Sequence, residues 1–318
     1  MLNFIKKLFY LSLMLFLISI ISFSAIHLAP NSFFSAGELN PNMTEETLTQ
    51  LKIVYGLDKS PIHQYIDWVL NILTLNFGIS FVTGGYVSEE IMKRLPITLT
   101  INLISLLFVF IISIYLGIKS ALHYEKKVDF LTKQLSVISF SMPSFYLALL
   151  SILFLSVNLN IFPISGLHSI ELKTGFSYYT DMAWHLVLPI SIIIFGGLGS
   201  MIIYIRSLTL EILKSDYYYF ALARGISKKR LFRYYLFPNL LPPIVTLLGL
   251  SLPGLIGGSV ILESIFGIDG MGQLFFMSAL SRDYPVIMGI LIITSFLTLL
   301  GNILADILLL RLNPYIGK

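Results

Sequence analysis

The residues best suited to charge-based chemistry are cations gathered between residues 206 and 236. This stretch holds 7 of the 21 Lys and Arg residues in the chain: Arg206, Lys214, Arg224, Lys228, Lys229, Arg230 and Arg233. Guanidinium and ammonium groups bind carboxylates, phosphates or an anionic surface. The cluster therefore predicts either an anchor at a membrane surface or a docking site for a partner.

The order of residues 216–246 favours docking. It predicts a helix, a stop at Gly225, a short basic helix capped by Ser227, and prolines before an apolar span. The small residues Ala221 and Ala223 lie on the first helix, and the cationic patch lies on the second. A positive-inside anchor needs only charge, whereas an exposed helix pair is typical of a docking element for a cytoplasmic partner.

Covalent catalysis has no comparable signal. The chain has no Cys, which excludes thiolate metal sites and a Cys nucleophile. It also lacks a G-x-x-x-x-G-K-[ST] phosphate loop, an H-E-x-x-H pair and a G-x-S-x-G turn. We therefore expect no catalytic residues, no cofactor and no ATP hydrolysis by this chain.

Composition places the cations on an integral membrane protein. Hydrophobic residues make up 56% of the chain and charged residues 12%, whereas soluble domains carry about 25% charged residues. Six charge-poor runs are long enough to cross a bilayer. Their lengths favour helices over the short alternating strands of a barrel. We expect an all-α bundle with six transmembrane helices near residues 8–28, 97–118, 134–157, 184–205, 237–262 and 285–309.

The distribution of charge predicts the orientation. An inside N-terminus places 15 of the 21 basic residues inside and 12 of the 17 acids outside, so both termini are expected in the cytoplasm. The first span has no clear cleavage site and is expected to be retained. The net charge of +4 is too small to indicate nucleic-acid binding. The predicted regions are a first helix at 1–28, an external region at 29–95, a core at 96–310 containing the inner loop 206–236, and a tail at 311–318.

Polar and flexible positions inside the spans are candidates for a solute pathway or gate. Gly257 and Gly258, near the outer end of the fifth span, allow a break or close helix contact. Glu263 begins a segment that either enters the external mouth or forms an ordinary outer loop. Asp306 is an acid in the last span and is expected to face the bundle, where a structural hydrogen bond is favoured over solute contact.

Residues 220–243 resemble the EAA loop of ABC-importer permeases in the dipeptide, oligopeptide and nickel family. Phe220-Ala221-Leu222-Ala223-Arg224-Gly225 fills the first block of that motif, and Pro238-Asn239-Leu240-Leu241-Pro242-Pro243 fills the second. Phe220, Leu222 and Pro238 depart from the family pattern. The resemblance covers nearly the whole chain, including Ser141-Met142-Pro143-Ser144-Phe145, residues 251–266 and Gly270-Met271-Gly272-Gln273-Leu274. The long external region is similar to that of the first of the two permease subunits.

The resemblance implies a type I importer permease of MetI-like fold in the bacterial cytoplasmic (inner) membrane. It implies a second homologous permease subunit, cytoplasmic ABC ATPase subunits and an extracytoplasmic solute-binding protein as partners, in a lipid bilayer. It also implies that the ATPase docks on the residues that match the loop: Ala221, Ala223, Arg224, Gly225, Lys228, Lys229, Arg230, Asn239 and Pro243. A secondary transporter or channel would explain the spans, but it would not explain the element from Gly225 to Pro243.

The transported solute is the most open question at this level. Leu75-Asn76-Phe77-Gly78-Ile79-Ser80-Phe81 is more similar to the nickel branch than to the peptide branch, which favours nickel slightly over a dipeptide or oligopeptide. Four of the five histidines lie on the predicted outer side, and imidazole suits Ni²⁺. Their spacing forms no ligand cluster, so we predict no metal site from His27, His63, His168 and His185.

Overall fold

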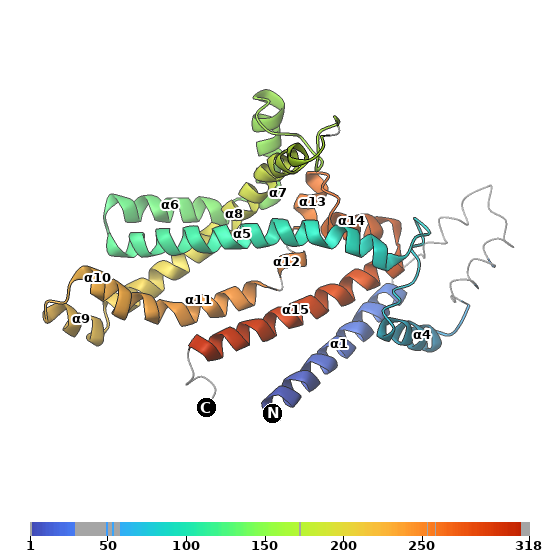
Figure 1. Ribbon diagram of the computed structural model, residues 1–318, viewed down its shortest axis with the longest axis horizontal. Coiled ribbons are helices and arrows are strands. Elements are labelled where there is room, and N and C mark those ends of the chain that lie inside the picture. Colours follow the sequence, from blue (N-terminus) through green and yellow to red (C-terminus); the bar gives the residue numbers. More distant parts are fainter. Residues whose placement is uncertain are drawn as a thin grey trace. The chain divides into compact units, whose positions relative to one another are not determined.

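The computed structural model describes residues 2–28, 49, 53, 58–171, 173–252, 254–257 and 259–312. These residues are predominantly helical, and their only strand-like pairing is an isolated antiparallel bridge between Ile79 and Tyr86. The all-α prediction is confirmed. The helices, shown in Figure 1, are α1 (Leu2–Leu28), α4 (Pro61–Leu73), α5 (Val87–Leu122), α6 (Lys127–Ser141), α7 (Ser144–Ser151), α8 (Phe176–Leu213), α9 (Asp216–Ala223), α10 (Lys228–Leu231), α11 (Phe237–Ser251), α12 (Gly254–Gly257), α13 (Val260–Ile265), α14 (Met271–Ser281) and α15 (Tyr284–Leu312), with π-helical turns η1 (Ile152–Asn158) and η2 (Phe232–Leu236).

Three helices in the described part of the chain are long and apolar enough to cross a membrane singly: α5, α8 and α15 over Tyr284–Leu304. A fourth candidate is α6 taken together with the helix at Ser144–Asn158, but the two are bent by 95°. The single helix predicted near 134–157 is therefore wrong, because the helix breaks between Ser141 and Ser144. The reason lies at Pro143, which has no N–H to donate, and at Met142, which adopts the extended backbone (ψ 120°) that residues before proline prefer.

The long helices extend well beyond the predicted spans. Helix α5 has 36 residues and α8 has 38, so each is about 55 Å long, compared with about 30 Å of hydrocarbon. The predicted spans at 97–118 and 134–157 leave residues 119–133 between them, but the structure has only residues 123–126 between α5 and α6. Helix α8 continues through the first eight residues of the predicted loop 206–236. Charge-free runs mark the apolar part of a helix, not its ends, because charged turns remain helical outside the hydrocarbon.

The predicted fifth span is interrupted. Helix α11 ends at Ser251 and is followed by the short helices α12 and α13, so the break that the glycines allowed is present. Pro253 and Gly258 lie outside the described residues. Pro242 and Pro243 lie inside α11 rather than ahead of it.

The chain divides into two compact units, of which the first comprises residues 1–97 and 270–299. In this unit a buried carboxylate closes the loop after α4. Asp283 accepts hydrogen bonds from the Ser80 hydroxyl at 2.5 Å and from the Phe81 amide at 3.0 Å. In the same unit, the Tyr65 hydroxyl lies 2.8 Å from Ser19 Oγ, which connects α4 with α1.

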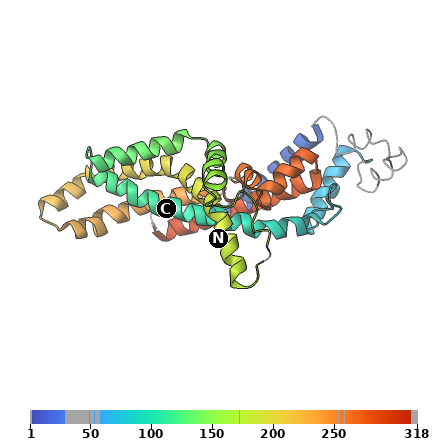
Figure 2. The ribbon, with the colours of Figure 1, turned by 90° about the horizontal axis from the view of Figure 1, so that it is seen from above.

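The second unit comprises residues 98–269 and 300–318 and contains a buried apolar core. Within it, α5, α6 and α8 run side by side, as both ribbon views show (Figures 1 and 2). The approach is close because small residues line it. A Cβ on Gly117 would lie 2.8 Å from Ile205, and a Cβ on Gly199 would lie 2.6 Å from the Ser136 carbonyl oxygen.

Candidate functional site

The cationic stretch folds as two short helices, α9 and α10, joined by a glycine turn. Gly225 has φ +75°, a conformation that glycine adopts without steric cost. Its amide donates to the Leu222 carbonyl at 2.9 Å, and the Ile226 amide donates to the Ala221 carbonyl at 3.3 Å. These two bonds are the pair that defines a Schellman cap. The predicted helix stop at Gly225 is confirmed.

The second helix of the pair also begins where the sequence predicts. Ser227 has the extended backbone of an N-cap, and its carbonyl oxygen accepts from the Leu231 amide at 2.9 Å. The Ser227 side chain makes no capping bond. We call residues 216–233 the basic helix pair. Three predicted docking residues precede Gly225 in this pair. Ala221 is buried, whereas Ala223 and Arg224 are exposed.

The basic helix pair is fixed to the core of the second unit. Leu231 is 1% exposed, and Tyr218 packs against the core cluster. Burial raises the pKa of the Tyr218 hydroxyl, so this group stays neutral at physiological pH. The cluster is formed by residues of α5, α8, η2 and α11: Phe110, Ile118, Ile205, Ile212, Leu236, Leu240 and Ile244. Tyr218 thereby connects the basic helix pair to packed helices of this unit.

The opposite side of the pair presents charge and aromatic surface. Five cations are exposed, and within the described residues none of them forms an ion pair with a carboxylate: Arg224, Lys228, Lys229, Arg230 and Arg233. Tyr219, Phe220 and Tyr234 are between 63% and 65% exposed beside them. Aromatic and Arg side chains are enriched in protein interfaces. The fold leaves these groups available to a partner.

Asn239 and Pro243, the last two residues assigned to the docking loop, lie on α11 and not on the basic helix pair. The Asn239 side-chain amide donates to the Tyr235 carbonyl at 2.6 Å. Pro243 cannot donate to the Asn239 carbonyl, so the helix begins with an irregular hydrogen-bond ladder. The π-helical turn η2 precedes this start. These residues shape the connection between the basic helix pair and α11.

The pathway candidates are distributed over three helices. Glu263 is buried in α13, where its Oε1 accepts from Thr98 Oγ1 at 2.9 Å and from Ser259 Oγ at 2.6 Å. Gly257 ends α12 in open space, Asp306 is half-buried in α15, and Gly258 lies outside the described residues.

Sequence reasoning missed the partners of Glu263. Asn102 donates to Ser259 Oγ at 2.8 Å and to the Thr98 carbonyl at 2.9 Å, which completes a buried network between α5 and α13. The available signal was the spacing of Thr98 and Asn102, two polar residues one helical turn apart in an apolar span.

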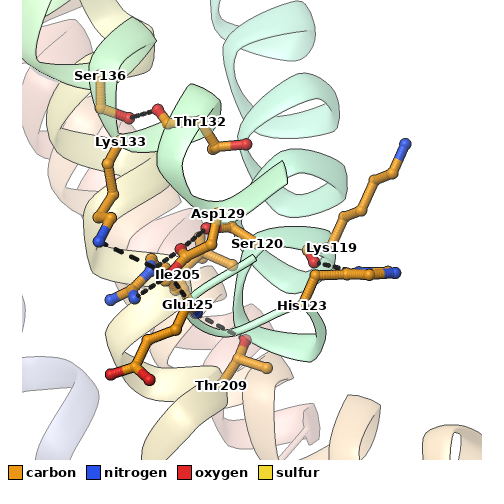
Figure 3. Close-up of polar contacts among 11 residues, drawn as sticks. Lys119, Ser120, His123, Glu125, Asp129, Thr132, Lys133, Ser136, Ile205 and Thr209 are labelled. Atoms are coloured by element: carbon orange, nitrogen blue, oxygen red, sulfur yellow. Dashed lines mark hydrogen bonds and ion pairs between the residues drawn. The ribbon is translucent and has the colours of Figure 1, made fainter. Parts of the chain in front are cut away.

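A second missed cluster lies where α5, α6 and α8 meet. Asp129 of α6 is fully buried and accepts two hydrogen bonds from Arg206 of α8, at 2.6 and 2.8 Å. Figure 3 shows Ser120 and Glu125 converging on the same carboxylate, with the Ser120 hydroxyl at 2.5 Å and the Glu125 amide at 3.1 Å. The available signal was a pair of acids, Glu125 and Asp129, among the four lysines of residues 119–133.

Two of the predicted outer histidines meet at Asp181 of α8. His185 Nδ1 lies 2.8 Å from the Asp181 carbonyl oxygen, and His168 stacks on Tyr178 with ring centroids 4.0 Å apart. The Asp181 carboxylate binds Lys173 Nζ at 2.7 Å. His63 bonds Ser60, and the side chain of His27 lies outside the described residues. Among the described residues, no group of three or more His, Asp and Glu side chains is arranged to hold a metal ion.

Comparison with known proteins assigns the chain to a family of transport proteins through two consecutive matches. Residues 111–318 match the family described as binding-protein-dependent transport system inner membrane component, and residues 1–102 match the N-terminal part of such membrane components. The oligopeptide transport system permease protein AppB of Bacillus subtilis is 37% identical over 94% of both chains. The dipeptide transport system permease protein DppB of Lactococcus lactis is 33% identical over 98% of this chain and 97% of its own.

Two further similarities extend the comparison. The metal-staphylopine import system permease protein CntB of Staphylococcus aureus is 34% identical over 86% of this chain and 84% of its own. A chain of the MetNI methionine ABC transporter, solved in inward-facing conformations, superposes with a TM-score of 0.54 at 19% identity. That superposition covers 68% of this chain and 93% of the solved one. It identifies the fold as the MetI-like permease fold.

Proposed function

This chain belongs to the family of binding-protein-dependent transport system inner membrane components and is a permease of an ABC importer, and from this premise we propose that its basic helix pair is the docking surface of the ATPase. The chain is a membrane-embedded transport subunit and not an enzyme, because ATP hydrolysis in these systems is performed by separate subunits. Membership of the family implies an ATPase and a solute-binding protein as partners.

The observation that carries the proposal is the set of five exposed cations that make no ion pair within the described residues. They lie on Schellman-capped helices whose other side packs into the core. A membrane anchor would need the charges but not the rigid mounting, whereas a docking element must transmit force. The exposed aromatic side chains beside the cations provide apolar contact area for the same partner.

The proposal extends to the assembly and its orientation. A second homologous permease subunit completes the translocation path. In this chain, the regions of the proposal end at residues 28, 95 and 310, as the sequence predicts. Both termini and the loop 206–236 face the cytoplasm in the bacterial inner membrane, as the excess of basic residues favours. The solute-binding protein then delivers solute on the opposite side.

For the cargo we favour a short peptide, supported by the 37% and 33% identical relatives named for oligopeptide and dipeptide transport. Nickel, free or chelated, is the second candidate, supported by the 34% identical relative named for metal-staphylopine import and by the resemblance of residues 75–81. Titrating the purified partner solute-binding protein with di- to pentapeptides, with NiCl₂, and with nickel in the presence of a chelator separates the two. Binding of peptides alone would exclude nickel.

Docking is tested by reversing the charges. The variant K228E/K229E/R230E should insert into the membrane but lose co-purification of the ATPase subunit. The control K126E/K127E reverses two exposed cations at the start of α6 and should retain the ATPase. Retention of the ATPase by the triple variant would overturn the docking proposal.

A further inference from the structure

Helix α6 is built with its polar side toward the protein. Its buried residues are Asp129, Thr132, Ser136 and Ser139, spaced by three or four positions and so on one helical face. Ser139 Oγ accepts from the Gly199 amide of α8 at 2.9 Å. Other positions of α6 expose Phe130, Leu131 and Phe140. This arrangement joins α6 to α8 by hydrogen bonds and close backbone contact.

One end of this interface is closed by an ion pair. Arg206 Nε donates to Asp129 Oδ1 at 2.6 Å, and a terminal guanidinium nitrogen donates to Oδ2 at 2.8 Å, so the pair is bidentate. The carboxylate side chain is 0% exposed and the Arg206 side chain is 14% exposed. The hydroxyl of Ser120, near the end of α5, donates a third hydrogen bond to the same carboxylate, as Figure 3 shows. Three helices therefore converge on one carboxylate.

The neighbouring turns of α8 pack against the residues that attach the basic helix pair to the core. Ile205 and Ile212 pack in the core cluster with Leu236 and Leu240, which follow the pair in the chain. Ile205 also abuts Gly117 of α5. This part of α8 therefore makes two kinds of contact. Its apolar side chains pack against the residues that follow the basic helix pair, and its Arg206 forms the ion pair with α6.

We propose that the Asp129–Arg206 pair is the coupling joint that makes α5, α6 and α8 move as one body when the ATPase moves the basic helix pair. The inference rests on the docking function proposed above. Apolar contacts are non-directional and allow helices to slide, whereas a buried bidentate pair holds one relative rotation of the two helices. Asp129 and Arg206 are positioning residues in this account and contact no solute.

The joint is tested by measuring whether the helices stay together through the ATP cycle. Because the chain has no Cys, spin labels can be placed uniquely at Q134C of α6 and S207C of α8, two exposed positions. In the complete importer, pulsed electron paramagnetic resonance should give the same narrow distance distribution with and without ATP-vanadate. In D129N, ATP-vanadate should produce a second distance population that the parent lacks.

The controls separate the ion pair from general damage. D129N removes the charge but keeps one oxygen acceptor, which can take the bond from Ser120, made to Oδ1, or the bond from the Glu125 amide, made to Oδ2. K133A removes only a half-exposed cation 3.7 Å from the same carboxylate. K133A should behave as the parent does. If D129N fails to assemble, R206K replaces it and should also show the second distance population with ATP-vanadate. Lysine keeps the positive charge but cannot form the bidentate pair.

Two results would overturn the joint: a distance in the unmutated pair that changes with ATP-vanadate, or a D129N complex that holds its ATPase and keeps one narrow distance. Failure of the docking proposal is visible separately. It appears as ATPase retention by K228E/K229E/R230E, a variant that leaves Asp129 and Arg206 intact.

Discussion

The Thr98 hydroxyl of α5 donates a hydrogen bond to the Glu263 carboxylate of α13 at 2.9 Å, linking residues 165 positions apart. The same oxygen accepts from Ser259 at 2.6 Å. A carboxylate buried to 1% exposure is costly unless it is hydrogen-bonded, so these hydroxyls are part of what keeps Glu263 in place. The short helix α13, isolated from α11 by the break in the fifth span, is thereby held to the long helix α5.

Glu263→Ala should destabilise the protein because it leaves the Thr98 and Ser259 hydroxyls buried with a partner removed. The cost is about 1–3 kcal/mol for each group left unsatisfied. Glu263→Gln keeps a carbonyl oxygen and should lose much less. Thermal unfolding of the purified permease in detergent measures the order of the two variants. Equal unfolding temperatures for Ala and Gln would contradict the hydrogen-bonding role.

Gly225 should tolerate Asn better than Val. Its φ of +75° suits Asn far better than a β-branched residue, and a Cβ would meet no atom within 4 Å, so the effect is conformational and not steric. Gly225→Val should uncouple ATP hydrolysis from solute uptake while the chain still inserts, and Gly225→Asn should keep most uptake. The control is Gly254→Ala, which also adds a Cβ in open space but without a positive φ. Normal uptake by the Val variant would refute the role of the turn.

Gly199 should be the most sensitive glycine in α8. A Cβ there would lie 2.6 Å from the Ser136 carbonyl oxygen and 2.8 Å from the Phe140 amide, both backbone atoms that cannot move aside cheaply. Gly199→Ala should therefore push α6 from α8 and cost about 1–3 kcal/mol. Gly196→Ala, on the same helix, meets only Ser144 Cβ at 4.0 Å and should be nearly neutral. Apparent unfolding temperatures of the two variants test the contrast.

Local signals in the sequence were sufficient for the helical class, for the spans within α5, α8 and α15, and for the glycine turn. The stop at Gly225 depends on neighbouring residues alone, so the pattern predicted it correctly. The bend at Pro143 also had a local cause. A proline inside a hydrophobic run nevertheless predicts only a kink in a continuous helix. Membrane helices accommodate proline when neighbouring groups bond to the backbone carbonyl that has lost its partner.

The polar clusters could not be predicted in the same way. Asp129 and Arg206 are 77 residues apart, and Ser259 and Asn102 are 157 apart. Their proximity depends on which face of each helix turns inward, and α6 has its polar face buried and apolar side chains exposed. Hydropathy identifies a span but leaves its rotation undetermined, so pairing across helices required the structure.

The predicted orientation can be tested by labelling single cysteines, because the chain has no Cys of its own. Single substitutions S227C, at the start of α10, and S177C, in the first turn of α8, place one exposed thiol on each predicted side. A membrane-impermeant maleimide applied to intact cells or spheroplasts should label S177C and leave S227C unlabelled until the membrane is permeabilised. The reason is that 15 of the 21 basic residues lie on the side assigned to the cytoplasm, and basic loops stay inside. Labelling of S227C in intact cells, with S177C protected, would invert the topology and remove the basic helix pair from reach of a cytoplasmic ATPase.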